Sequence, residues 1–192
     1  MPTSLPAADK AIRVIGFDDA PFTKGAPSVS VAGVVCNNTR FAGMIWGRAQ
    51  RDGFDATSVL VQMLTASKYH PQVHAVLLDG IAVGGLNIID LPELAERLER
   101  PCIALMRKMP DIAAMKKVIA TLPSPRRRLA LLQRAGTIHH KPPFFFQVAG
   151  ISYRDAMRVL HQVTDTGHVP EALRLAHLIG SAVELGESRG RA

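Results

Sequence analysis

The first part of the chain alternates short apolar segments with turn-forming residues, which is the pattern of a β-meander. The apolar segments are residues 11–17, 28–36 and 40–49. Asn37, Asn38 and Thr39 lie between the second and third segments and supply the turn of a hairpin. The pattern therefore predicts three antiparallel strands in succession.

A continuous apolar run at residues 75–78 gives a clear strand signal. It lies between His74 and the pair Asp79-Gly80, and such a run is typical of a strand buried on both faces of a parallel or mixed sheet. Asp79 is then at the carboxyl end of a central strand, where open α/β sheets place ligands and chemistry. An Asp-Gly pair after a strand is also a common turn, so both interpretations stand at this point.

Helix-like and strand-like segments alternate through the remainder of the chain. Helices are predicted at residues 56–67, 90–99, 111–122, 125–135, 153–163 and 170–185, and strands at 102–108 and 144–150. A three-strand meander followed by alternating helices and strands is the layout of the ribonuclease H-like fold, an α/β class with a mixed sheet flanked by helices. That layout makes neighbours of the ends of the first strand and of the strand at 75–78. Asp18 and Asp79 occupy those two ends.

A chain of 192 residues is long enough for one domain with a full core. Residues 11–185 are predicted to form it, between a flexible leader at 1–10 and a flexible tail at 186–192. Cys36 and Cys102 lie in apolar runs and are predicted to be buried, reduced thiols. The first residues lack a signal-peptide pattern, and no stretch approaches the roughly 20 apolar residues of a membrane span. A cytoplasmic protein without a membrane partner is therefore expected, in an oligomeric state that the sequence leaves open.

The charge balance is compatible with a polyanionic partner such as nucleic acid. The chain has 23 Lys and Arg residues against 16 Asp and Glu, a formal net charge of +7. Many basic proteins bind no nucleic acid, so this excess alone does not decide the partner. Arg126, Arg127 and Arg128 begin a predicted helix, where the helix dipole disfavours cations. Either a solvated face or a phosphate partner explains this run.

The paired carboxylates suggest a metal site. Two carboxylates a few ångströms apart repel each other unless a cation lies between them. Mg²⁺ or Mn²⁺ takes carboxylate and water oxygens and can activate water for phosphodiester hydrolysis. Asp18 and Asp79 are the predicted ligands, with Asp19 as an additional or alternate ligand. The alternative for Asp18 and Asp19 is a hydrogen-bonded turn between strand and loop.

Residues 15–22, 77–105 and 167–179 resemble an uncharacterised domain family of archaea and bacteria that is related to endonuclease V, which cleaves nucleic acid near inosine. The resemblance covers nearly the whole chain from residue 12. The motifs that match endonuclease V itself are Gly16-Phe17-Asp18, Asp79-Gly80 and Arg174-Leu175-Ala176-His177. The resemblance implies an endonuclease V-like mixed sheet and a Mg²⁺- or Mn²⁺-dependent endonuclease acting on DNA or RNA.

Two positions depart from the endonuclease V pattern. A Glu is expected in a Phe-Arg-Glu-like run, but this chain has Arg48-Ala49 there. Asp52 replaces that carboxylate, or the site has lost it. The His that follows Asp-Gly in endonuclease V has no counterpart, and the basic residue after the next strand is matched by Arg107 or Lys108.

The resulting candidate site combines residues from several predicted elements. The catalytic candidates are Asp18, Asp79, Asp52, Lys108 and His177, and the nucleic-acid contacts are Arg48, Arg51, Arg107 and Trp46. His177 lies on the apolar side of its helix, where a core role and a role at the metal are both compatible with the pattern. Trp46 is suited either to the core or to stacking on an unpaired base. His139 and His140 are predicted to lie in a loop and, without further ligands at suitable spacing, not to bind zinc.

Two hypotheses follow. The first is a metal-dependent nuclease, or a protein derived from one, that acts on structured or modified nucleic acid. The second is a non-catalytic nucleic-acid-binding or interaction module that keeps the fold and has lost the full acidic set. The retained pair Asp18 and Asp79 favours the first hypothesis, and the missing Glu favours the second.

Overall fold

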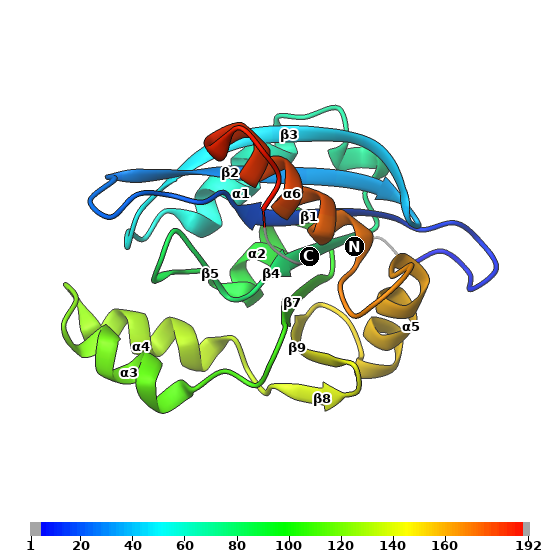
Figure 1. Ribbon diagram of the computed structural model, residues 1–192. Helices are drawn as coiled ribbons and strands as arrows, with labels where there is room; N and C mark the ends of the chain where they lie inside the picture. The colour runs from blue at the N-terminus through cyan, green and yellow to red at the C-terminus, as the bar shows by residue number, and fades with distance from the viewer. Residues whose placement is uncertain (1–4, 190–192) are drawn as a thin grey trace.

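The computed structural model describes residues 5–189 and contains a mixed seven-stranded sheet with helices on both faces (Figure 1). The strands of this sheet are β1 (Arg13–Asp19), β2 (Ser28–Asn37), β3 (Arg40–Gln50), β4 (Ala75–Asp79), β7 (Cys102–Met106), β8 (His139–Lys141) and β9 (Phe144–Ala149). The helices are α1 (Ala56–Thr65), α2 (Leu91–Leu98), α3 (Ile112–Ala120), α4 (Pro125–Arg134), α5 (Tyr153–Val163) and α6 (Glu171–Leu185), with a short 3₁₀ helix, η1 (His70–Gln72). A separate small hairpin consists of β5 (Ala82–Val83) and β6 (Asn87–Ile88).

The strand order confirms the predicted fold class. The order is β3-β2-β1-β4-β7-β9-β8. β1, β2 and β3 form the antiparallel meander, whereas β1, β4 and β7 run parallel. In the pairing of β1 with β4, Phe17 lies opposite Leu78, so the two strands end side by side.

The sheet has a hydrophobic core on each face because successive side chains of its central strands point to opposite sides. Ile15 and Phe17 pack on the face covered by α1 and α2. Val14 and Leu77 pack on the other face, against α5 and α6. Both faces are covered, so the central strands are continuous apolar runs rather than alternating ones.

Gly16 sets the distance between β1 and α6. A Cβ atom at this position would lie 2.8 Å from the backbone carbonyl carbon of Ala172 and 2.8 Å from the backbone nitrogen of Leu173. Such contacts involve helix backbone, which cannot move aside as a flexible side chain can. The glycine of the Gly-Phe-Asp motif is therefore a packing requirement that brings α6 close to the end of β1.

Several local predictions need correction. Asp18 and Asp19 are the last residues of β1 and still pair with β2, so they do not form a strand-to-loop turn. His139 and His140 lie in β8 rather than in a loop, because the ring of His140 stacks on Phe145 of the neighbouring β9 at 4.1 Å between ring centroids. The small β5–β6 hairpin was not predicted, since strands of two residues have no periodicity to detect.

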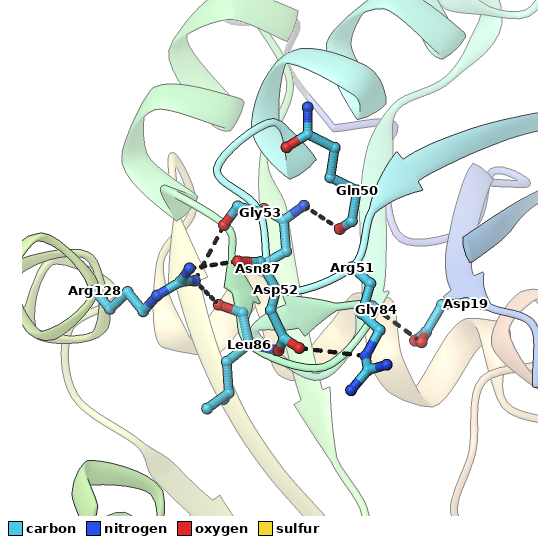
Figure 2. Close-up of polar contacts among 9 residues, drawn as sticks. All are labelled: Asp19, Gln50, Arg51, Asp52, Gly53, Gly84, Leu86, Asn87 and Arg128. Carbon is cyan, nitrogen blue, oxygen red and sulfur yellow. Dashed lines mark hydrogen bonds and ion pairs between the residues drawn. The ribbon is translucent and has the colours of Figure 1, made fainter. Parts of the chain in front are cut away.

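Arg128 joins α4 to two loops at the end of the sheet (Figure 2). Its side chain is buried, and the guanidinium donates hydrogen bonds to four backbone carbonyl oxygens. These belong to Pro123, Gly53, Leu86 and Asp52. A buried cation needs partners of this kind to offset the loss of water. The interpretation of the basic run as a solvated face is therefore wrong for Arg128, whereas Arg126 and Arg127 are exposed.

The remaining predictions concern the ends of the chain, the thiols and the membrane. Residues 1–4 and 190–192, in the predicted leader and tail, lie outside the described residues. The backbone oxygens of Pro6 and Lys10 accept hydrogen bonds from side chains of α5.

Cys36 and Cys102 are buried free thiols, as predicted. Within residues 5–189, no helix has the length and apolar character to cross a membrane.

The Gly16→Ala substitution tests the close packing of α6 on β1. We expect it to lower the free energy of unfolding by about 2 kcal/mol, because overpacking of a well-packed core typically costs 1–3 kcal/mol. Urea denaturation measures the change. The comparison variant is Gly136→Ala, which adds the same methyl group where no heavy atom of the described residues, apart from its chain neighbours, lies within 4 Å but where φ is +79°. It therefore reports the cost of backbone strain without a steric clash, and should lower the free energy of unfolding by about 1 kcal/mol. A loss at Gly16 no larger than that at Gly136 would contradict this role.

Candidate metal centre

The ends of β1, β4 and a turn of α6 bring three ligand-bearing side chains together. Asp18 and Asp79 follow the paired residues Phe17 and Leu78, so they lie next to each other at one edge of the sheet. His177 lies on α6, and its Nδ1 atom is 3.0 Å from the Oδ2 atom of Asp18. One ligand atom from each of these three residues lies within 4.8 Å of the others.

The environment strongly disfavours a charged Asp18 carboxylate. Asp18 is only 7% exposed. Burial, and then repulsion from the carboxylates of Asp79 and Asp19, raises the pKa of Asp18 from 3.8 to about 8. Arg107 opposes the shift and forms an ion pair with Asp79, with 3.1 Å between its Nη2 atom and Oδ2. Without a cation, this environment therefore favours the protonated form of Asp18.

This donor set fits a divalent cation of the Mg²⁺ or Mn²⁺ type. Such ions prefer carboxylate oxygens, and Mn²⁺ also accepts an imidazole nitrogen. A cation between Asp18 and Asp79 would offset their mutual repulsion, the main electrostatic cost besides burial. Because Asp18 must lose its proton to act as a ligand, binding of the cation would release a proton.

Asp19 and Asp52, two predicted carboxylates, lie outside this group of three. Asp19 accepts a hydrogen bond from the backbone nitrogen of Gly84 at 3.1 Å, and burial raises its pKa. The Oδ1 atom of Asp52 accepts from the backbone nitrogen of Leu86 at 2.8 Å, and its Oδ2 atom pairs with Arg51 at 3.3 Å. Figure 2 shows the contact of Asp19 with Gly84 and that of Asp52 with Arg51. The structure thus uses both carboxylates to hold the loop that contains Gly84.

The position that lacks the expected Glu is part of the core. Ala49 is 2% exposed and packs on the α1 face of the sheet. Its neighbour Arg48 is exposed, and its Nη2 atom donates to the Oγ atom of Ser28 at 3.0 Å. Trp46 lies on the same strand, two strands away from β1, and is partly exposed. Of the predicted basic residues, Arg107 contacts the acidic group directly, and Lys108 is an exposed neighbour.

A cavity of about 790 Å³ opens beside Asp79, between the loop after β4 and the pair α3–α4. Its lining includes Gly80, Met115, Leu129, Leu132 and Gln147. Sequence reasoning missed this cavity. The sequence shows only that the segments of α3 and α4 carry apolar residues, and not where those residues lie. In the described chain, the buried residues of these helices are Ile119 and Arg128, so other apolar side chains are left to line a cavity.

The family model for endonuclease dU matches residues 10–184. The chain belongs to the endonuclease dU family. A UPF0215 protein of Methanothermobacter thermautotrophicus is 37% identical to this endonuclease dU family member over 187 residues, which cover 94% of this chain and 92% of the relative. Family membership confirms the resemblance to an uncharacterised family related to endonuclease V.

Solved structures share the fold of this endonuclease dU family member. A protein of unknown function from Archaeoglobus fulgidus has a TM-score of 0.85 and 28% identity, over 90% of this chain and 98% of that one. Endonuclease V from Ciona intestinalis, in complex with a 24mer DNA containing an inosine followed by a ribo-adenosine, has a TM-score of 0.61 and 16% identity. That match covers 92% of this chain and 87% of that one. At 16% identity, this similarity shows that the two proteins share a fold.

The raised pKa of Asp18 predicts how stability depends on pH. Between pH 3.8 and about 8 the unfolded chain loses the Asp18 proton while the folded protein keeps it, so this group lowers the free energy of unfolding as the pH rises. Asp18→Asn removes the effect. In EDTA, the stability of the Asn variant relative to wild type should rise by at least about 1 kcal/mol between pH 5 and pH 9.

Urea denaturation at pH 5, 7 and 9 measures this difference. Asp165→Asn, in an exposed loop, provides the matched control and should show no trend. A constant difference between wild type and Asp18→Asn across the three pH values would contradict the assignment.

Proposed function

We propose that the protein is a metal-dependent endonuclease that hydrolyses phosphodiester bonds of nucleic acid at the group formed by Asp18, Asp79 and His177. The observation that carries the proposal is the approach of these ligand atoms to within 4.8 Å of one another. Two carboxylates this close in a largely buried site are costly without a cation. Membership of the endonuclease dU family and the endonuclease V-like fold support a nuclease.

Each residue of the site has a role that follows from its contacts. Asp18 and Asp79 would hold Mg²⁺ or Mn²⁺, with Asp19 nearby. When bound, the cation supplies a Lewis acid that activates water and neutralises charge on the phosphate. His177 orients Asp18 or joins it as a ligand, since its Nδ1 atom lies 3.0 Å from that carboxylate. Arg107 holds Asp79 and, with the exposed Lys108, offers positive charge to a phosphate.

The proposed substrate is nucleic acid with an altered base. The family description names dU, and the neighbouring endonuclease V complex contains inosine. We therefore place deoxyuridine first and inosine second among the candidates. The cavity beside Asp79 has a volume within the range of small-molecule sites. Its apolar walls suit an unpaired base, which needs a stacking surface outside the duplex.

A second candidate is a nucleic-acid-binding protein without catalysis. Ala49 favours it, because a buried methyl group occupies the position where endonuclease V supplies a carboxylate. In this alternative, the acidic group either binds a structural cation or remains as two carboxyl groups that share a proton, and it catalyses no reaction.

Cleavage of end-labelled DNA separates the two candidates. The substrates are matched oligonucleotides that carry one deoxyuridine, one inosine or only normal bases. With Mg²⁺ or Mn²⁺ we expect wild type to cut the deoxyuridine strand, and EDTA to abolish the reaction. Asp79→Asn should lower the rate at least about 100-fold, because loss of a direct ligand should cost more than loss of a residue behind a ligand.

Asp165→Asn, with the same change in charge at an exposed loop, should cleave as wild type does. Cleavage that survives EDTA, or that is equal in Asp79→Asn and wild type, would contradict the proposed function.

A further inference from the structure

The positive charge of the chain is concentrated in one segment. Residues 107–135 contain eight Lys and Arg residues against one Asp, whereas the whole chain contains 23 and 16. The remaining residues therefore hold 15 basic and 15 acidic side chains. The entire formal net charge of +7 belongs to the exit of β7 and to the α3–α4 hairpin, defined here as residues 111–135.

The α3–α4 hairpin lies at the margin of the molecule and beside the acidic group. Figure 1 shows its two helices next to each other at one end, away from α5 and α6. The basic segment begins at Arg107, which contacts Asp79. Met115 and Lys116 of the hairpin line the cavity that Gly80, the residue after Asp79, also lines. The hairpin and the site thus border the same cavity, and Lys116 brings one of the exposed cations to it.

Part of this charge already has partners within the protein. Arg107 pairs with Asp79, and the Nε atom of Arg134 lies 2.8 Å from the Oδ2 atom of Asp90. Arg128 is buried on backbone carbonyls. The cations left at the surface of the hairpin are Lys116, Lys117, Arg126 and Arg127, all exposed.

The first turn of α4 gives an independent indication of an anionic partner. Arg126 and Arg127 follow Pro125 at the N-terminus of the helix, where the helix dipole disfavours positive charge. Arg127 lies over the ring of Phe54, 4.2 Å from its centroid. This contact offsets part of the electrostatic cost of a cation at the helix N-terminus. A row of phosphates would offset the remainder, since it satisfies both the cations and the helix N-terminus.

Arg128 fixes this surface relative to the acidic group. Its guanidinium binds the carbonyl oxygens of Asp52, Gly53 and Leu86, and the loop that contains Leu86 also donates the Gly84 N–H to Asp19 (Figure 2). The hairpin is therefore fastened to the same loop that contacts the neighbour of Asp18. Cations held in this way can set the position of a long anion at the carboxylates.

We propose that the α3–α4 hairpin binds the phosphate backbone of the nucleic acid whose phosphodiester lies at Asp18 and Asp79. The location of the scissile bond and the choice of nucleic acid as the occupant rest on the proposed function, whereas the exposed cations of the hairpin do not depend on it. The occupant is a polyphosphate backbone rather than an acidic protein segment, because the cations lie beside a group suited to phosphodiester chemistry.

Salt dependence of binding tests the proposal. Anisotropy of a fluorescein-labelled DNA oligonucleotide, as single strand and as duplex, is measured in EDTA from about 50 to 200 mM salt. Binding weakens as salt rises, so the slope of log affinity against log salt is negative. The double variant Lys117→Gln/Arg126→Gln should make this slope shallower by roughly two and weaken binding about tenfold or more at low salt. Lys24→Gln/Arg40→Gln removes the same charge from exposed positions elsewhere and should leave the slope unchanged.

The outcomes separate this inference from the proposed function. Equal slopes for wild type and the hairpin variant would overturn the hairpin surface, even if wild type cleaves DNA with a metal. A reduced slope in a protein that never cleaves with Mg²⁺ or Mn²⁺ would uphold the surface and contradict the nuclease. Displacement of the oligonucleotide by polyglutamate as effectively as by unlabelled DNA of equal charge would overturn nucleic acid as the occupant.

Discussion

The burial of Asp18 beside a second carboxylate is the constraint on which the site depends. The register of two parallel strands brings Asp18 and Asp79 together, and Asp18 is only 7% exposed. Burial is the larger cost of a charged Asp18, and repulsion from Asp79 adds to it. The protein limits this cost in three ways. Asp18 holds its proton more tightly, Arg107 pairs with Asp79, and His177 lies against Asp18. A divalent cation would serve the same purpose while removing the proton.

The surrounding fold maintains this arrangement at some distance from the carboxylates. Gly16 lets α6 approach β1 closely enough for His177 to reach Asp18. On the other side, Arg128 ties α4 to the loops that hold Asp52 and that contact Asp19. Close packing of α6 on β1 thus positions one side of the site, and the buried, hydrogen-bonded side chain of Arg128 positions the other.

Apolar patterns predicted the sheet and most helices because both faces of the sheet are buried. The meander and the run at residues 75–78 fitted a ribonuclease H-like layout, which placed Asp18 beside Asp79 from the sequence alone. Arg128 was harder to interpret, since its carbonyl partners lie up to 76 residues away in the chain. Its place at a helix start, unfavourable for a cation, was the one local sign of special partners. The position of the cavity could not be predicted because it depends on how α3 and α4 lie relative to the loop after β4.

Titration with Mn²⁺, followed by electron paramagnetic resonance of the free ion, tests the central claim most directly because it needs no substrate. Wild type at pH 8 should remove the free Mn²⁺ signal. Asp18→Asn and Asp79→Asn should bind at least about tenfold more weakly. Asp52→Asn should bind as wild type does, because Asp52 holds a loop instead of the ion. Equal binding by all four proteins, or loss of binding only in Asp52→Asn, would contradict a metal centre at Asp18 and Asp79.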